Sequence, residues 1–270
     1  MEYEFLKVRV EGGIAEVEMH RPEKANAIDW NAFTEIQRAF EQLGDQPEVR
    51  AIILRGAGKH FCAGIDLSLL MGLNEIVASD CEGRKRERLR KLIFQLQAPV
   101  NAIADCPQPV MAAIQGGCIG AGLDIAAACD MRYCTPNAYF TIKEIDMGMV
   151  ADLGVLQRLP GIIPEGILRE MAYTARKVPG EEAVRIGLVN RAYPDPEGLL
   201  AGVREIAQRI AAKSPLSIRG NKEILNYNRR KNIDEGLNYI AIWNAAMLLS
   251  EDLTVAGRAA ALRQQPKFHD

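Results

Sequence analysis

The chain has 270 residues, of which 48% are hydrophobic and 25% are charged, as in an ordinary soluble globular protein with a sizeable core. Its formal net charge of −2 gives no electrostatic reason to expect nucleic acid or an anionic membrane as a partner. No apolar run reaches the roughly 18 residues of a membrane-spanning helix. The sequence shows no secretory signal, transit peptide or peroxisomal tripeptide, so we expect a cytoplasmic protein, with a processed organellar protein as the alternative.

Hydrophobic periodicity predicts mixed strands and helices up to about residue 190, and helices alone after it. Strands are predicted at Phe5–Val10, Ile14–His20, Arg50–Arg55, Pro109–Ile114, Asp130–Cys134 and Ala138–Thr141. Helices are predicted at Trp30–Leu43, Arg84–Asp105, Leu123–Ala128, Pro164–Tyr173, Gly180–Ile186, Glu197–Lys213, Pro215–Asn228, Ile233–Ser250 and in a final stretch to about Leu262. We therefore expect an α/β core domain over residues 1–195 and a C-terminal helical lobe over residues 196–270.

Three short sequence signals predict local features of these strands and helices. The dipeptide Gly12-Gly13 predicts a hairpin between the first two strands. Asp29 is suited to cap the helix that follows it. Pro99 should kink or locally break the helix in which it lies, because proline lacks the N–H that the helix needs.

Two loops rich in small residues each follow a predicted buried strand. The first, HFCAGIDL, spans residues 60–67, and the second, GGCIGAG, spans residues 116–122 before a helix. Backbone N–H groups at such a helix N-terminus favour developing negative charge. The glycines alone also fit a tight packing point, but two such loops can each supply one N–H to a single oxygen and form an oxyanion hole.

Three acids, Asp124, Glu144 and Asp152, lie among small or apolar residues. A carboxylate in apolar surroundings loses hydration, which raises its pKa and suits it to proton transfer. Each acid alone has a simpler interpretation, as a charge near a helix N-terminus, a surface-loop acid or a helix cap. Together they favour acid–base chemistry, since nucleophile-elbow, phosphate-loop and zinc motifs are missing and no metal-ligand spacing stands out.

The sequence resembles the enoyl-CoA hydratase/isomerase (crotonase) superfamily. The matching pieces, in order, are HRPEKANAID, AIILRGAG, HFCAGIDL, GGCIGAGLDIAAACDMRYCTPNAYF and KEIDMGMVADLGVLQRLP. Within the superfamily it is most similar to the Δ3,5-Δ2,4-dienoyl-CoA isomerases. In these enzymes an aspartate follows the glycine loop, a glutamate lies 20 residues after that aspartate, and a second aspartate lies 8 residues after the glutamate. Asp124, Glu144 and Asp152 have this spacing. Hydratases instead place glutamates at the first two positions and no acid at the third.

The resemblance implies an α/β spiral of ββα units with a C-terminal helical trimerisation lobe, assembled as a homotrimer or as a hexamer built from two trimers. It implies an acyl-CoA thioester as substrate, with no metal and no cofactor apart from the CoA of the substrate. The oxyanion donors map to the backbone N–H groups of Ile65 and of Ala121, where the family usually has glycine.

The resemblance also assigns residues to the CoA moiety. Ala25, Ala63 and Asp66 fall in segments that line the adenine pocket in relatives. Lys222 is a weaker candidate for a contact with a CoA phosphate.

The implied activity converts 3,5-dienoyl-CoA into 2,4-dienoyl-CoA in fatty acid β-oxidation, by moving a proton from C2 to C6. Asp152 is assigned as the base at C2, Glu144 as the acid at C6 and Asp124 as the residue that tunes them. The division between Glu144 and Asp152 stays open, because in hydratases the position of Glu144 serves C2. The alternatives are a 2-enoyl-CoA hydratase, a Δ3-Δ2-enoyl-CoA isomerase or a non-catalytic RNA-associated protein, against which the near-neutral charge and the three acids argue.

Overall fold

The structure, a computed structural model, describes residues 3–229 and beyond them only residues 251, 255, 258, 259, 262, 264, 267 and 268. The strands are β1 Leu6–Glu11, β2 Ile14–Met19, β3 Ala51–Gly56, β4 Val110–Ile114, β5 Gly117–Ile119, β6 Met131–Cys134, β7 Tyr139–Thr141, β8 Val178–Pro179 and β9 Arg191–Ala192. The α-helices are α1 Trp30–Gly44, α2 Leu67–Ile76, α3 Glu82–Asp105, α4 Ala121–Ala128, α5 Val155–Arg158, α6 Glu165–Thr174, α7 Gly180–Arg185, α8 Pro196–Ala211 and α9 Pro215–Asn228. Short 3₁₀ turns are η1 Pro22–Lys24, η2 Glu144–Met147 and η3 Leu159–Gly161.

The strands belong to two sheets that the chain visits alternately. The larger sheet has the order β1-β2-β3-β4-β6-β9, and the smaller one has the order β5-β7-β8. The chain passes from β4 in the larger sheet to β5 in the smaller one and then into α4, and β6 and β7 repeat the step. This alternation confirms the predicted α/β spiral of ββα units. Only β1 runs antiparallel in the larger sheet, while the other neighbouring pairs are parallel.

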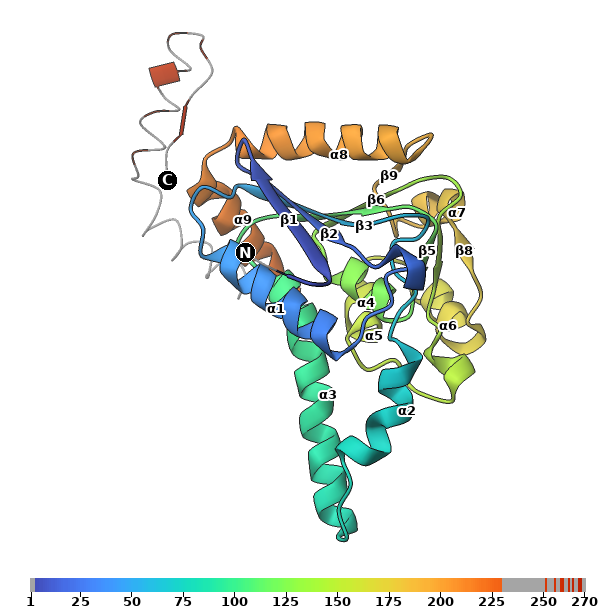
Figure 1. Cartoon of the computed structure of the whole chain (residues 1–270). Helices are drawn as coiled ribbons and strands as arrows, with labels where there is room; N and C mark the ends of the chain where they lie inside the picture. The colour runs from blue at the N-terminus through green and yellow to red at the C-terminus, as the bar shows by residue number, and fades with distance from the viewer. Residues whose placement is uncertain are drawn as a thin grey trace.

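The central strands β3 and β4 of the larger sheet are buried on both faces, as their nearly continuous apolar sequences require, whereas the edge strand β1 is largely exposed. Alternate residues of β3 point to opposite sides, so that Ile52 and Leu54 join the main core while Ile53 joins a second cluster with Val203 and Ala207 of α8. Figure 1 shows α8 across one face of the sheet and α1, α3 and α4 below the other. Helix α3 extends far beyond the sheet, and a short loop at its outer end connects it to α2 (Figure 1).

Two of the local predictions are confirmed. Strands β1 and β2 form the hairpin, in which Glu11 pairs with Ile14 across the two glycines. Asp29 caps α1, because its side chain accepts a hydrogen bond from the N–H of Ala32 at 2.9 Å. The predicted break at Pro99 is wrong, since α3 continues through this residue for 24 residues in all. One lost hydrogen bond is tolerated there because Pro99 and its neighbour Val100 are buried against the core.

The sequence missed α2 and the short strands β5, β8 and β9. The stretch LSLLMGLNEI of α2 is apolar almost throughout, so it has no helical period to detect. The three short strands have two or three residues each and exist by pairing with distant partners.

Of the predicted C-terminal lobe, the structure describes helices α8 and α9 with the residues next to them, and a few single residues further on. Helix α8 packs on the sheet of the predicted core, and the boundary at residue 195 stays a prediction. The helix predicted at Ile233–Ser250 lies outside the described residues, and of the stretch after it only single residues are described.

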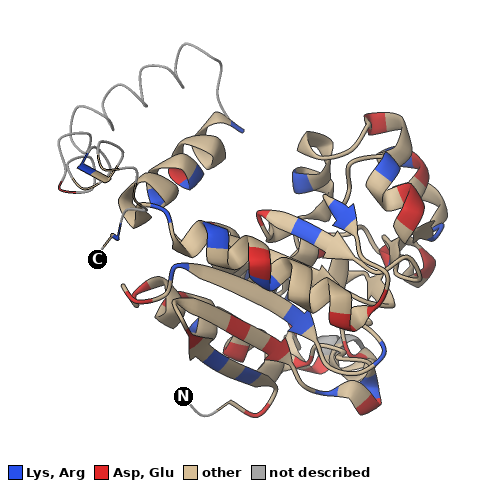
Figure 2. Ribbon diagram, turned by 90° about the horizontal axis from the view of Figure 1, so that it is seen from above, with Lys and Arg blue, Asp and Glu red and all other residues tan. Residues whose placement is uncertain are grey.

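Charged residues of both signs are interspersed along the ribbon (Figure 2). Several are paired across elements, for example Arg204 of α8 with Glu16 of β2 and Arg55 of β3 with Glu18 of β2. No helix among the described residues is both long and apolar enough to cross a bilayer. In the same part of the chain, no three His, Cys, Asp or Glu side chains gather in a group that could hold a metal ion.

Candidate active site

The glycine loop turns the chain from β5 into α4. Gly120 has φ +52° and ψ −121°, a backbone conformation that side chains other than hydrogen rarely permit. Its carbonyl accepts hydrogen bonds from the N–H groups of Leu123 at 2.7 Å and Asp124 at 3.1 Å. Ala121 is the first residue of α4, where the helix offers its N–H no partner. The predicted donor therefore lies at the positive end of a helix.

The second predicted donor, Ile65, lies on the neighbouring loop. Ile28 donates to the carbonyl of Gly64 at 2.8 Å and accepts from the N–H of Asp66 at 2.9 Å. In a parallel pairing of this kind, the N–H of the residue between them points away from Ile28. The loop closely approaches the start of α4, because a Cβ added to Gly64 would lie 3.6 Å from the nitrogen of Ala121.

Asp124 lies in the first turn of α4 and is fully buried. Its Oδ1 accepts a hydrogen bond from the backbone N–H of Val155 at 2.6 Å, whereas Oδ2 is buried without a hydrogen-bond partner among the described residues. Burial, together with the charge of Glu144, raises the pKa of Asp124 to about 8, although the bond from Val155 opposes the shift. The acid is therefore largely protonated at neutral pH.

Glu144 begins the turn η2 and is half-buried beside the glycine loop. A Cβ added to Gly120 would lie 3.2 Å from Oε1 of Glu144, so the carboxylate fits against the space that this glycine leaves open. Its Oε2 is buried and has no hydrogen-bond partner within the described part of the chain. Burial raises the pKa of Glu144, and the charge of Asp152 adds to the shift.

Asp152 is the outermost of the three acids. The residue as a whole is exposed at the surface. Its carboxyl group is nevertheless partly buried by its surroundings, and this partial burial raises the pKa of Asp152. The charge of Asp152 also raises the pKa of Asp124. The structure thus brings together three acids from three segments, buried progressively less from Asp124 through Glu144 to Asp152.

The residues predicted for CoA binding adjoin Ile65. The N–H of Ala63 donates to the carbonyl of Ala25 at 2.9 Å. The Asp66 carboxylate caps α2, accepting bonds from the N–H and hydroxyl of Ser68, and it also pairs with Lys24 at 3.3 Å. The hydrogen bonds from Ser68, with a smaller effect of Lys24, lower the pKa of Asp66 to about 2. Through these contacts with Ser68 and Lys24, the Asp66 carboxylate stabilises the conformation of the loop.

The structure places Lys222 differently from the sequence prediction. Its Nζ donates to Asp130 Oδ2 at 2.8 Å and to the carbonyl of Gln108 at 3.0 Å, and its side chain is only 7% exposed. A CoA phosphate would require an accessible ammonium group, so Lys222 instead links α9 to Gln108 before β4 and to Asp130 before β6.

Sequence reasoning missed the contacts from α3. Gln97 donates to the backbone carbonyl of Asp152 at 2.6 Å, and Asn101 accepts a bond from Arg158 at 2.6 Å. The only signal in the sequence is a pair of uncharged polar residues one helical turn apart.

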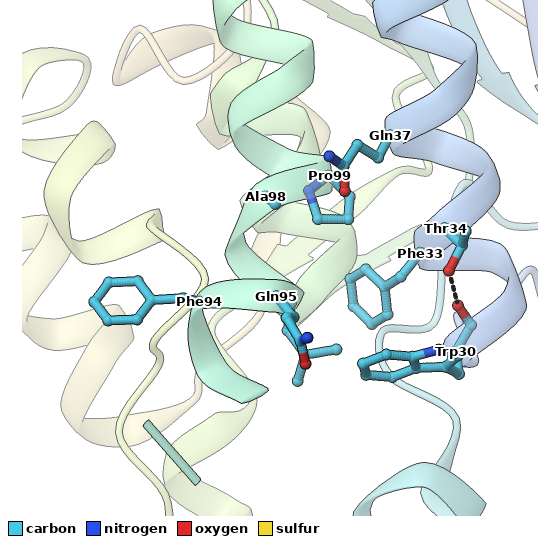
Figure 3. A pocket seen from close by; sticks show the side chains of 9 residues that line it. Trp30, Phe33, Thr34, Gln37, Phe94, Gln95, Ala98 and Pro99 are labelled. Atoms are coloured by element: carbon cyan, nitrogen blue, oxygen red, sulfur yellow. Dashed lines mark hydrogen bonds between the residues drawn. The ribbon is translucent and has the colours of Figure 1, made fainter. Parts of the chain in front are cut away.

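A hollow of about 380 Å³ lies elsewhere, between α1 and α3, and is lined by Trp30, Phe33 and Gln95 among others. Figure 3 shows these three side chains grouped between the two helices, with Phe94 directed away from them. None of the three acids lines this hollow.

Comparisons with known proteins agree with this architecture. The model of the enoyl-CoA hydratase/isomerase family matches residues 9–268. A peroxisomal Δ3,5-Δ2,4-dienoyl-CoA isomerase of Arabidopsis thaliana is 42% identical over 98% of this chain and 96% of its own, and a mitochondrial one of Mus musculus is 39% identical over 98% of this chain and 82% of its own. The crystal structure of an enoyl-CoA hydratase from Bacillus anthracis superposes with a TM-score of 0.89 at 26% identity, covering 98% of this chain and 99% of the other.

These relatives correct the predicted location. The sequence led us to expect a cytoplasmic protein, but the two isomerases are named peroxisomal and mitochondrial, which points to an organelle. The prediction was wrong because it rested only on missing address signals, and a missing signal is not evidence of a location.

Proposed function

The chain belongs to the enoyl-CoA hydratase/isomerase family, and from this membership we propose that it isomerises 3,5-dienoyl-CoA to 2,4-dienoyl-CoA in fatty acid β-oxidation. The observation that carries the proposal is the presence of Asp152 beside Asp124 and Glu144, three acids whose charges act on one another next to a glycine loop. The two relatives that bear the name of this activity support it.

The proposed reaction starts at C2, where Asp152 in its ionised form removes a proton. The electron pair spreads over the thioester oxygen, C2, C4 and C6 as a trienolate, and the oxygen is held by the N–H groups of Ile65 and Ala121. Glu144 in its protonated form then delivers a proton to C6, which leaves double bonds at C2 and C4. The raised pKa of Glu144 supports this role, because it keeps a proton available nearer to neutral pH.

The depth of each acid fits its proposed role. Asp152 lies outermost, and its charged form keeps water contact before substrate binds. Asp124 lies deepest, and its pKa of about 8 keeps it largely neutral at pH 7, so that it does not add a second negative charge to that of the ionised Asp152. We assign it to tuning and orienting the other two acids.

Substrate binding and assembly complete the proposal. The segments of Ala25, Ala63 and Asp66 are assigned to the CoA moiety, beside the exposed cation Lys24, and the reaction needs no cofactor besides CoA itself.

We assign residues 196–270 to a helical lobe that assembles a homotrimer or a hexamer of two trimers. Light scattering on the purified protein measures this state directly, and a monomer would contradict it.

The activity is tested with the purified protein and two substrates. We expect 3,5-dienoyl-CoA to give the conjugated 2,4-dienoyl product, followed by its ultraviolet absorbance, faster than 2-enoyl-CoA is hydrated. Hydration much faster than isomerisation would overturn the proposal and favour the hydratase alternative.

A further inference from the structure

Helix α3 contacts the segment that carries Asp152 at two points. Gln97 Nε2 donates to the backbone carbonyl of Asp152 at 2.6 Å. Arg158 links the second point, because it donates to Asn101 Oδ1 at 2.6 Å and to the backbone carbonyl of Leu153 at 3.2 Å. Gln97 and Asn101 are four residues apart, so they lie one above the other on the same face of α3.

The backbone after Asp152 is also fixed from the other side. Val155 donates to the buried Asp124 at 2.6 Å. Gly154 between them has φ +121°, and a Cβ there would clash with the guanidinium group of Arg158. The segment from Asp152 to Val155 is therefore held between α3 on one side and α4 on the other.

The Asp152 carboxyl itself has no such support. Within the described residues, no other side chain forms a hydrogen bond with it, so its position follows from the position of its backbone. A catalytic group displaced by about 1 Å can lose about 100-fold in rate. The bonds that hold the Asp152 carbonyl therefore bear on catalysis without touching the substrate.

We propose that Gln97, Asn101 and Arg158 are positioning residues that fix the Asp152 carboxyl relative to Glu144, an inference that rests on the proposed isomerase function. Gln97 and Asn101 are uncharged, so they act on geometry. Arg158 also lowers the pKa of Asp124 through its charge, so a change at Arg158 would mix two effects, and the test uses the other two positions.

The experiment measures kcat and KM for a 3,5-dienoyl-CoA with Gln97→Met, Asn101→Leu and Asn101→Asp in the full-length protein. Methionine has nearly the length of glutamine but donates no hydrogen bond, and leucine removes the acceptor for Arg158. We expect kcat to fall about 10- to 100-fold in Gln97→Met and Asn101→Leu, with KM nearly unchanged. Asn101→Asp keeps an acceptor for Arg158 and should restore most of kcat.

The same substitutions are then made in an Asp152→Asn background. A residue that acts only through Asp152 should have no further effect once that carboxylate is gone, whereas a general structural role would lower the residual rate again. The matched control is Gln95→Met on the same helix. Gln95 lies on the side that faces Trp30 (Figure 3), and its replacement should leave kcat unchanged.

Several outcomes would overturn the inference. No isomerisation by the unaltered protein would defeat the proposed function and this inference with it. Normal isomerisation with unchanged kcat in both Gln97→Met and Asn101→Leu would defeat the inference alone. Equal losses with and without the Asp152 carboxylate would do the same. Thermal unfolding of each variant identifies any loss of kcat that comes from unfolding. Positions 97 and 101 are two independent tests, because a variant at one leaves the other unaltered.

Discussion

Asp124 Oδ1 accepts a hydrogen bond of 2.6 Å from the backbone N–H of Val155, 31 residues further along the chain. This bond joins the helix that begins with the oxyanion loop to the segment that carries Asp152. The second oxygen of the same carboxyl is buried without a hydrogen-bond partner in the described part of the molecule. Asp124 therefore connects two parts of the site through one oxygen and leaves the other unsatisfied, which makes its charged form unfavourable.

The replacement Asp124→Asn should stabilise the protein increasingly as the pH rises. Asp124 has a folded pKa of about 8, above its value in the unfolded chain. Folding therefore retains a proton that the unfolded chain releases, and this acid destabilises the protein progressively from about pH 4 to pH 8. Asparagine keeps an oxygen for Val155 but has no charge to bury.

The measurement is urea unfolding of both proteins at several pH values and one protein concentration. One pKa unit corresponds to about 1.4 kcal/mol, so the difference should reach several kcal/mol at pH 8 and then level off. Parallel stability curves between pH 5 and pH 8 would show that Asp124 is not titrating in this way.

Asp152→Asn and Glu144→Gln should each lower kcat for 3,5-to-2,4-dienoyl-CoA isomerisation by about 10²- to 10⁴-fold, the usual contribution of a general acid or base. The activity of the unaltered enzyme should fall as acid protonates Asp152, at a pH above the ordinary aspartate range because the pKa of Asp152 is raised. Initial rates from pH 4 to pH 9 measure both effects. Near-normal isomerisation by Asp152→Asn would show that Asp152 is not the base.

Local chemistry explains which parts of the fold could be predicted from the sequence. The Gly12-Gly13 hairpin and the Asp29 cap depend on residues close together in the chain, and both are present. Helix α2 was missed, although Asp66 and Ser68 at its start have the side chains of a helix cap. Strand β5 could not be found locally, because its three residues pair with β7 more than twenty residues away.

In the candidate site too, features that depend on nearby residues could be predicted, and features that depend on distant parts of the chain could not. The spacing of the acids is visible in the sequence, but their convergence depends on how the chain alternates between two sheets. The contact of Gln97 with the Asp152 carbonyl leaves no pattern at position 152, because any residue there would present the same backbone group. For Lys222 the sequence predicted a contact that the structure does not support. A lysine on a C-terminal helix is expected to be accessible, but the structure shows this one buried against Asp130.

Gly120→Ala should impair both stability and catalysis. The residue has φ +52°, so alanine would be strained there, by about 1–3 kcal/mol. The added Cβ would also lie 3.2 Å from Oε1 of Glu144 and displace that acid. We expect a loss of thermal stability and a kcat at least about tenfold lower.

Gly12→Ala is the matched control for this change. Gly12 also has a positive φ, of +57°, but a Cβ there meets no atom within 4 Å, and the residue lies in the β1–β2 turn. Its replacement should reduce stability while leaving kcat unchanged. Equal kcat losses in the two variants would show that backbone strain, and not the contact with Glu144, causes the effect.

Lys222→Met should destabilise the protein without weakening substrate binding. It would leave the Asp130 carboxylate without its cation in a largely buried place, where breaking an ion pair costs about 3 kcal/mol. Lys91→Met is the control, because Lys91 pairs with Glu87 at 3.2 Å on the exposed side of α3, and such a pair contributes less than about 0.5 kcal/mol. Urea unfolding measures both changes, and steady-state kinetics below the unfolding transition measure KM for the acyl-CoA. A KM raised about tenfold in Lys222→Met alone would mean that Lys222 does contact CoA, contrary to its position in the structure.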